Sequence, residues 1–288
     1  MAYLEGVGDA HRFVKAVQTH SQQKPLLVVK GGVSFEGQRA AASHTGSLAT
    51  DDRVFGGLCR QLGVVRAPTV EHAFEWAATF ATQPLPRGGR VAVLTSAGGW
   101  GALAADACVA AGLCVVALPE DVRRRIGRML PARWSCNNPV DLAGGETRDT
   151  IPEMIDLLAG HPAFDSVIYL GVGIQASQAH AFRSGHFYPR FGFDRIVEFH
   201  ESQDRRYAEA AREASERHGK PVLVATELVY TDEAYRNAGP LAVRQGGRIC
   251  YASAHRAVET LGALVAYAEY RRSLQAGAGE AISPGGAR

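Results

Sequence analysis

The chain has 288 residues, 46% of them hydrophobic and 21% charged, which is long enough for two globular domains of ordinary size. A formal net charge of +2 gives no electrostatic basis for binding nucleic acid or an anionic membrane surface, and no apolar stretch approaches a membrane span. Five cysteines without C-x-x-C spacing predict reduced thiols in a cytoplasmic protein, and the ten histidines show no metal-ligating spacing, so no metal site is expected.

The first residues predict two strands separated by a helix. The pattern indicates a strand end at 3–6, an amphipathic helix at 11–19 and a buried β-branched strand at 26–29. Two strands and one helix are too few for an open α/β sheet. We therefore expect an N-terminally truncated first domain that associates with another chain.

The segment after the second strand carries the candidate nucleophile. The small polar residues 40–47 predict a loop, which leads into apolar residues at helical spacing from Leu48 onward. His44 is then expected just before a helix N-terminus, where unpaired N–H groups and the helix dipole favour a phosphoryl group on the imidazole. The local sequence alone favours a simpler interpretation, in which His44 is a surface residue and its neighbours only cap the helix. These neighbours are Ser43, Thr45 and Ser47.

The first domain is expected to end at a proline- and glycine-rich linker. Residues 63–66 predict a short strand, and residues 69–80 predict a helix that begins at Thr69. Residues 83–89 contain two prolines and two glycines and are the clearest linker in the chain. The predicted division is 1–84 for the first domain, 90–272 for the second and 273–288 for a flexible tail.

A strand, a glycine turn and a helix open the second domain. They are predicted at 90–95, 96–101 and 102–111. Because glycines let backbone N–H groups approach a phosphate closely, this order predicts an anion-binding cradle. The alternative is the dinucleotide fingerprint Gly99-x-Gly101-x-x-Ala104, with Glu120 after the next strand as the ribose-binding acid. That alternative predicts a Rossmann-type nucleotide-dependent oxidoreductase.

The remaining chain alternates helices and strands, as in a doubly wound parallel sheet. The expected elements are helices at 151–158, 205–218 and 254–270 and strands at 113–118, 166–172, 221–226 and 248–251. The aromatic, His- and Arg-rich residues 175–201 interrupt this alternation, and we predict an interface there. The fold class is therefore α/β.

Several motifs together resemble the NDP-forming acyl-CoA synthetases, the superfamily of succinyl-CoA synthetase and ADP-forming acetate–CoA ligase. They are Lys24-Pro25, Lys30-Gly31-Gly32, AASHTG at 41–46, TSAGGWG at 95–101, Leu130-Pro131, NPVDL at 138–142 and the closing segments 250–258 and 267–272. The resemblance implies two flavodoxin-like domains and an acid–thiol ligase reaction. In that reaction His44 passes a phosphoryl group from ATP or GTP to a carboxylic acid, and CoA converts the acyl phosphate to acyl-CoA.

The resemblance also implies roles for individual residues. Glu5, in YLEG, matches the carboxylate that faces the phosphohistidine, and the glycine turn opens a second helix that points at it. The implied phosphate-binding set is Ser43, Thr45, Gly46, Ser47, Ser96, Ala97, Gly98, Gly99 and Gly101. Ser96 and Trp100 depart from the family pattern, which has Asn and a smaller residue there. Trp100, Asn138 and Asp141 are candidate substrate-binding residues, and Asp141 is equally suited to closing a turn.

Cofactors and partners follow from the same resemblance. It implies Mg²⁺ with ATP or GTP, bound mainly by an ATP-grasp subunit or domain, a separate CoA-binding domain, and CoA as a substrate. The chain is then expected to form an oligomer and to be inactive without the ATP-grasp partner. A third possibility is a non-catalytic CoA-ligase-like binding module.

Overall fold

The computed structural model describes residues 1–45, 51–145, 149–228 and 236–280, without the side chains of residues 44, 45 and 277–280. The chain divides into two compact units. The first comprises residues 1–81 and 263–288, and the second comprises residues 82–262. Both contain parallel sheets, which confirms the predicted α/β class.

The first unit is built on a parallel sheet in the order β1-β2-β3. Its elements are β1 (Ala2–Leu4), α1 (Ala10–Ser21), β2 (Leu27–Lys30), α2 (Phe35–Thr45), α3 (Asp52–Gln61), β3 (Val65–Ala67) and α4 (Val70–Thr82). All four residues of β2 are buried because this strand lies between the other two. Val28 packs there with Val17 of α1 and Phe55 and Cys59 of α3, so the apolar faces of two helices close the core.

The last helix, α11 (Ala254–Glu280), departs from the predicted domain division. From residue 263 onward it belongs to the first unit, although we predicted that residues 90–272 form one domain. The hydroxyl of Tyr267 donates to Ser21 O at 2.9 Å, and its ring meets Phe80 edge-on at 5.5 Å. Residues 273–280 continue the helix, so this part of the predicted flexible tail is helical, and residues 281–288 lie outside the described structure.

A glycine makes room for this helix in the first unit. Gly63 has φ +66, and a Cβ there would lie 2.1 Å from the ring of Tyr270. We expect Gly63→Ala to lower the free energy of unfolding by about 3 kcal/mol, because a clash with a packed ring adds to the backbone strain. Gly112→Ala is the matched control, since Gly112 has φ +73 but nothing within 4 Å. Equal losses in urea unfolding for the two variants would contradict the packing explanation.

The second unit holds a six-stranded sheet whose main path is β5-β4-β7-β8-β9, all parallel. Its strands are β4 (Arg90–Thr95), β5 (Cys114–Val115), β6 (Val140–Asp141), β7 (Ser166–Leu170), β8 (Val222–Ala225) and β9 (Cys250–Tyr251). Its helices, besides the start of α11, are α5 (Gly98–Ala110), α6 (Glu120–Gly127), α7 (Thr150–Gly160), α8 (Ile174–Arg183), α9 (Phe193–His218) and α10 (Ala238–Gln245), with a 3₁₀ turn at Arg190–Gly192.

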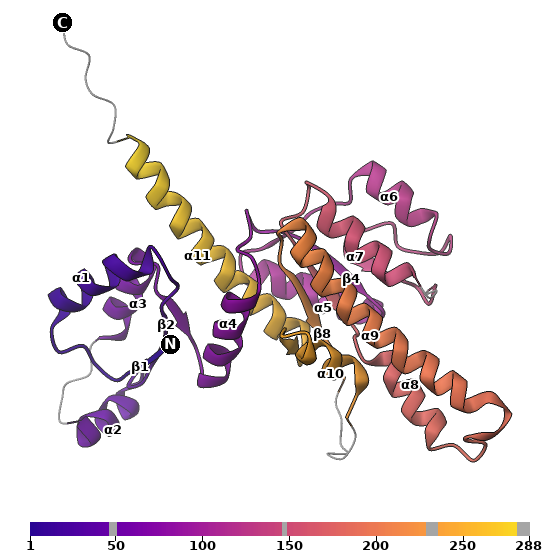
Figure 1. Cartoon of the computed structure of the whole chain (residues 1–288). Coiled ribbons are helices and arrows are strands. Elements are labelled where there is room, and N and C mark those ends of the chain that lie inside the picture. Colours follow the sequence, from indigo (N-terminus) through magenta and orange to yellow (C-terminus); the bar gives the residue numbers. More distant parts are fainter. Residues whose placement is uncertain (46–50, 146–148, 229–235, 281–288) are drawn as a thin grey trace, which may run out of the picture. The chain divides into compact units, whose positions relative to one another are not determined.

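Helices cover both faces of this sheet, as the doubly wound prediction requires. Ala92 and Leu94 of β4 face a core formed with α6, α7 and α9, where Ile126, Ile155 and Tyr207 are buried. In Figure 1, α7 and α9 lie side by side on this face. The alternate strand residues Val91 and Val93 are also fully buried, because period-2 alternation turns them toward the opposite helix layer.

The stretch 175–201, for which we predicted an interface, forms most of a helical hairpin (Figure 1). α8 and the beginning of α9 pack together, and aromatic rings gather between them at the tip. Phe187 stacks on Phe193 at 6.3 Å and meets Phe191 edge-on at 6.0 Å. Phe191 is 81% exposed in a left-handed backbone conformation with φ +57. The interface assignment stays a prediction.

Candidate functional site

The carboxyl edge of the first sheet holds Glu5. This residue follows β1 directly, and its side chain is half-buried. Tyr3 Oη donates to Glu5 Oε1 at 3.2 Å, and Lys30 Nζ donates to the Glu5 carbonyl at 2.9 Å. Because β1 and β2 are parallel neighbours, their carboxyl ends bring these three side chains together. The structure therefore places a fixed carboxylate at the end of the sheet, where sites of α/β proteins form.

The predicted setting of His44 is wrong. Residues 35–45 form α2, so the backbone of His44 lies in the last turn of a helix and not in a loop before one. The helix begins after Ser34, whose Oγ accepts from Gly37 N at 3.1 Å, and it continues through the alanines 40–42. The Ser34 cap and the helix-forming alanines favour a helix more strongly than the preceding glycines 31 and 32 favour a loop. The side chains of His44 and Thr45, together with Gly46 and Ser47, lie outside the described structure.

The helix that follows His44 starts later than predicted, and its N-terminus is already capped. α3 begins at Asp52, and Asp51 Oδ1 accepts from the N–H groups of Arg53 and Val54 at 2.9 and 3.2 Å. These two bonds lower the pKa of the Asp51 carboxyl below its usual value. Because a carboxylate occupies these N–H groups, α3 does not offer them to a phosphoryl group in this arrangement.

Ser43 is likewise committed to its own helix. Its hydroxyl donates to Arg39 O at 3.0 Å, one turn back in α2. This bond uses the hydroxyl hydrogen inside the helix, so the geometry does not present Ser43 as a donor to phosphate.

The glycine turn of the second unit lies at the N-terminus of α5. Ala97 is the N-cap residue in an extended conformation, and no side chain accepts a hydrogen bond from the first turn. Thr95 Oγ1 holds the turn instead, donating to Ala97 O at 2.8 Å and accepting from Ala97 N at 3.1 Å. Gly98 and Gly99 are exposed. The helix therefore begins four residues earlier than predicted and presents an uncapped, accessible end that suits an anion.

Asp141 borders this helix end. It lies opposite Thr95 in the pairing of β6 with β4, and its Oδ1 accepts from Ala143 N at 3.0 Å. A Cβ on Gly98 would lie 2.5 Å from Asp141 Oδ2, so the carboxylate sits directly against the glycine. Asp141 therefore closes a turn, as the alternative interpretation held, and also supplies negative charge beside the first turn of α5.

Asn138, which we predicted to bind substrate, instead bonds to the backbone of the sheet. Its Oδ1 accepts from Val93 N at 2.9 Å, and its Nδ2 donates to Val91 O and Val116 O, each at 2.8 Å. β5 pairs with the first half of β4 and β6 with its second half, so this amide bridges the interval between them. Both amide hydrogens are engaged with the backbone, and substrate binding by Asn138 has no support in this geometry.

The remaining predicted residues frame the turn. Ser96 follows β4, and its N–H bonds to Leu170 O at 3.3 Å, while Trp100 is half-buried in the first turn of α5. Gly101 is buried, and a Cβ there would lie 3.0 Å from both Pro139 and Thr95. Close packing between helix and strand is therefore the reason for glycine at this position.

The structure does not fit the dinucleotide-binding alternative. Gly99 and Gly101 lie inside α5 and not in a turn before it. Strand β5 ends at Val115, so Glu120 is not at a strand end but in the first turn of α6, where it pairs with Arg123. Glu120, the acid expected to bind a ribose, therefore lies on a helix surface in an ion pair with Arg123.

The sequence did not predict the buried carboxylate of Asp204, which contacts the backbone that follows β7. Asp204 of α9 is 1% exposed and accepts from Gly173 N at 2.9 Å and Ala176 N at 2.6 Å, which caps α8. Nearby, Asn237 Nδ2 donates to Gly173 O at 2.8 Å. No local pattern marks Asp204, because its partners lie 28 and 31 residues away. Burial raises the pKa of Asp204 to about 6.

This raised pKa predicts a pH-dependent stability. The folded state holds the proton up to about pH 6, whereas the unfolded chain releases it near pH 4. The contribution of Asp204 to the free energy of unfolding is therefore full below pH 4 and falls by about 3 kcal/mol as the pH rises to 7. Urea unfolding should show this change as a pH-dependent difference between the unaltered chain and Asp204→Asn. A difference that stays constant from pH 4 to 7 would contradict it.

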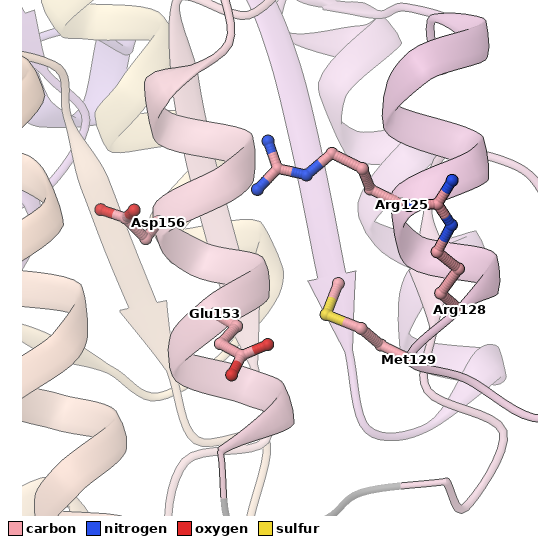
Figure 2. Close-up of a pocket in the computed structure, with 5 residues that line it drawn as sticks. All are labelled: Arg125, Arg128, Met129, Glu153 and Asp156. Carbon is pink, nitrogen blue, oxygen red and sulfur yellow. The ribbon is translucent and has the colours of Figure 1, made fainter.

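A pocket of about 340 Å³ lies between α6 and α7, away from the predicted site residues. Figure 2 shows Arg125 extending toward α7, where Glu153 and Asp156 stand, with Arg128 and Met129 completing the lining. Asp156 also pairs with Arg217 at 2.7 Å and His218 at 2.8 Å. The pocket is thus a mixed-charge surface feature, and we assign no chemistry to it.

Within residues 1–45, 51–145, 149–228 and 236–280, no cluster of three or more His, Cys, Asp or Glu side chains is placed to hold a metal ion. No helix there combines the length and apolarity needed to cross a membrane.

Comparison with known proteins identifies the chain in two segments. Residues 1–80 match the succinyl-CoA ligase like flavodoxin domain, and residues 91–175 match the ligase-CoA domain. The first segment contains Glu5 and His44, and the second contains the glycine turn and Asp141.

Individual proteins agree with these matches. The ADP-forming 4-hydroxybutyrate–CoA ligase of Nitrosopumilus maritimus is 31% identical over 94% of this chain and 35% of its own length. The alpha subunit of ADP-forming acetate–CoA ligase I of Pyrococcus furiosus is 38% identical over 59% of this chain and 37% of its own. A structure of the dinucleotide-forming acetyl-coenzyme A synthetase 1 of Ca. Korarchaeum cryptofilum, with phosphate and ADP, aligns with a TM-score of 0.74 and 26% identity, covering 98% of this chain and 55% of that one.

Fold and site together define an α/β protein of flavodoxin-like units with an open helix N-terminus suited to an anion. The chain belongs to the NDP-forming acyl-CoA synthetase family. It spans little more than a third of the length of the curated relatives named above.

Proposed function

We propose that this chain is the phosphohistidine-bearing part of an NDP-forming acid–thiol ligase. The observation that carries the proposal is the joint match of two family domains, because one contains His44 with Glu5 and the other contains the uncapped end of α5. The named relatives are ADP-forming ligases that join an acid to CoA. The proposed product class is therefore an acyl-CoA.

The reaction has three steps. An imidazole nitrogen of His44 attacks the γ-phosphorus of ATP or GTP, so that a P–N bond forms, the P–O bond to the diphosphate breaks and the imidazole loses a proton. A carboxylate oxygen of the acid then takes the phosphoryl group, which gives an acyl phosphate and restores His44. Finally the CoA thiolate attacks the acyl carbon and releases inorganic phosphate.

Within this cycle the chain's own groups have separate tasks. Glu5 accepts a hydrogen bond from the imidazole and stabilises its charged form, which raises the nucleophilicity of the other nitrogen. The N–H groups at the start of α5, from Gly98 and Gly99, bind a phosphate oxygen. Support for this second task is the absence of a side-chain cap on α5 and the exposure of both glycines.

Nucleotide with Mg²⁺ is proposed to bind mainly to an ATP-grasp subunit or domain, and CoA to a separate CoA-binding domain. The support is that the relatives are two to three times longer than their matching parts. We also propose that the chain needs the ATP-grasp partner for activity and assembles with it into an oligomer. The boundaries 1–84 and 90–272 remain proposals for the individual domains, apart from the placement of α11 described above.

Phosphoryl labelling tests the proposal. The full chain is incubated with [³²P]acetyl phosphate alone, and with γ-³²P-labelled ATP or GTP, Mg²⁺ and an ATP-grasp chain that labels a known family member. We expect an acid-labile, alkali-stable label on the chain. If neither donor labels it, the relay is contradicted and the chain is a non-catalytic CoA-ligase-like module.

A further inference from the structure

Glu5 is held at the sheet edge by two strands at once. Gly31 N donates to Leu4 O at 2.8 Å, which extends the pairing of β1 with β2 up to the residue before Glu5. Lys30 Nζ donates to the Glu5 carbonyl at 2.9 Å and to the Gly31 carbonyl at 2.6 Å. The backbone around Glu5 is therefore held by Lys30 and Gly31 at the end of β2.

Lys30 is an unusual residue for this task. Only 6% of its surface is exposed, its ammonium lies 5.9 Å from the centre of the Phe55 ring, and burial lowers its pKa. Removing an ammonium from water is costly unless hydrogen bonds replace the water. The carbonyls of Glu5 and Gly31 provide these hydrogen bonds. In return, the Lys30 ammonium holds the backbone at Glu5 and Gly31 in place.

The Glu5 side chain is oriented by Tyr3. The Tyr3 hydroxyl donates to Glu5 Oε1 at 3.2 Å, although the Tyr3 residue is 60% exposed. An exposed tyrosine contributes little to core packing. We therefore attribute the role of the Tyr3 hydroxyl to its hydrogen bond with Glu5. Partial desolvation of the Tyr3 hydroxyl and, after it, the hydrogen bond to the negatively charged Glu5 raise the pKa of Tyr3.

Gly31 leaves the space that the Tyr3 hydroxyl occupies. A Cβ on Gly31 would lie 2.4 Å from Tyr3 Oη and 3.4 Å from Glu5 Cγ. Gly31 is not among the glycines with positive φ, so alanine is compatible with its backbone. Gly31→Ala should therefore displace the hydroxyl from Glu5 without straining the turn.

We propose that Tyr3 is a positioning residue for phosphoryl transfer, acting through the Glu5 carboxylate. The inference rests on the proposed function, in which Glu5 orients the phosphoryl-accepting histidine. The Tyr3 hydroxyl restricts the rotation of Glu5, while Lys30 and the Leu4 carbonyl hold its backbone. Orientation of this kind affects the rate of transfer and not the affinity for the phosphoryl donor.

The test is the single-turnover rate of label transfer from [³²P]acetyl phosphate to the full chain. Tyr3→Phe removes the hydroxyl, and Gly31→Ala pushes it away from the other side. We expect each variant to be labelled about tenfold more slowly, while the acetyl phosphate concentration that gives half the maximal labelling rate stays unchanged. Gly8→Ala is the matched control for Gly31→Ala, because nothing lies within 4 Å of the Cβ it introduces, and it should label at the unaltered rate.

A double-mutant cycle separates positioning from a general structural effect. In a Glu5→Gln background, Tyr3→Phe should cause no further slowing, because the group through which it acts is gone. Equal slowing in both backgrounds, or undiminished rates in Tyr3→Phe and Gly31→Ala, would overturn the positioning role while leaving the relay intact. A lack of label on the unaltered chain would overturn the relay and the positioning role together.

Discussion

His44→Asn is expected to abolish phosphoryl labelling of the chain, with a loss of at least about 10³-fold in the rate of label transfer. Asparagine approximates the shape and polarity of the imidazole but has no nucleophilic nitrogen. The measurement is acid-labile, alkali-stable ³²P on the full chain after incubation with [³²P]acetyl phosphate, followed by phosphoamino acid analysis. Circular dichroism of the variant shows whether α2 and the rest of the fold persist.

His20→Asn is the control for this experiment. His20 is an exposed residue near the end of α1 and has no part in the proposed relay. It should label like the unaltered chain. Label retained on His44→Asn at the normal rate would assign the phosphoryl group to a different residue and contradict the proposed function.

Gly98→Ala is expected to have the largest effect in the second unit. The new Cβ would lie 2.5 Å from Asp141 Oδ2, and Asp141 cannot turn away freely because its Oδ1 bonds to Ala143 N. We expect the free energy of unfolding to fall by about 2 kcal/mol, since either the helix start or the β6 turn must shift. Phosphoryl transfer should fall at the same time, because the N–H groups of Gly98 and Gly99, which are proposed to bind phosphate, are displaced.

Substitution of the neighbouring Gly99 is expected to change the stability in the opposite direction. A Cβ on Gly99 would have nothing within 4 Å, so Gly99→Ala adds a methyl group in open space within α5. Alanine is the better helix former, and we expect stability to rise by about 0.5 kcal/mol. Thermal unfolding of both variants is the measurement. A loss of stability in Gly99→Ala equal to that in Gly98→Ala would contradict the assigned contact with Asp141.

Buried strands and long amphipathic helices were predictable from the sequence. The strand over 90–95 agrees with β4 residue for residue, and the helix over 11–19 lies within α1. Both carry their signal locally, as β-branched runs or as apolar residues at helical spacing. The loop prediction was wrong at residues 40–45, which belong to α2. The polar residues and the preceding glycine turn favoured a loop, whereas the cap at Ser34 and the alanine run favour a helix.

The candidate site was predictable in its motifs but not in its geometry. The segments around Glu5, His44 and the glycine turn are recognisable because short motifs carry their chemistry in consecutive residues. The amide of Asn138, by contrast, bonds to β4 and to residue 116, which lie 22 to 47 positions earlier in the chain. Such partners are chosen when the sheet assembles, so a motif alone does not separate a structural asparagine from a binding one.

The sequence by itself determined the family and the α/β class, since both follow from short motifs and from hydrophobic periodicity within single elements. Tertiary structure decided which helix ends are open. α8 is capped by Asp204, 31 positions away in the chain, whereas α5 has no side-chain cap. It also assigned the end of α11 to the first unit, through a bond from Tyr267 to Ser21 across 246 residues. These outcomes depend on non-local contacts that form only when the chain is folded, because burial and hydrogen-bond geometry select among partners that the local sequence leaves equivalent.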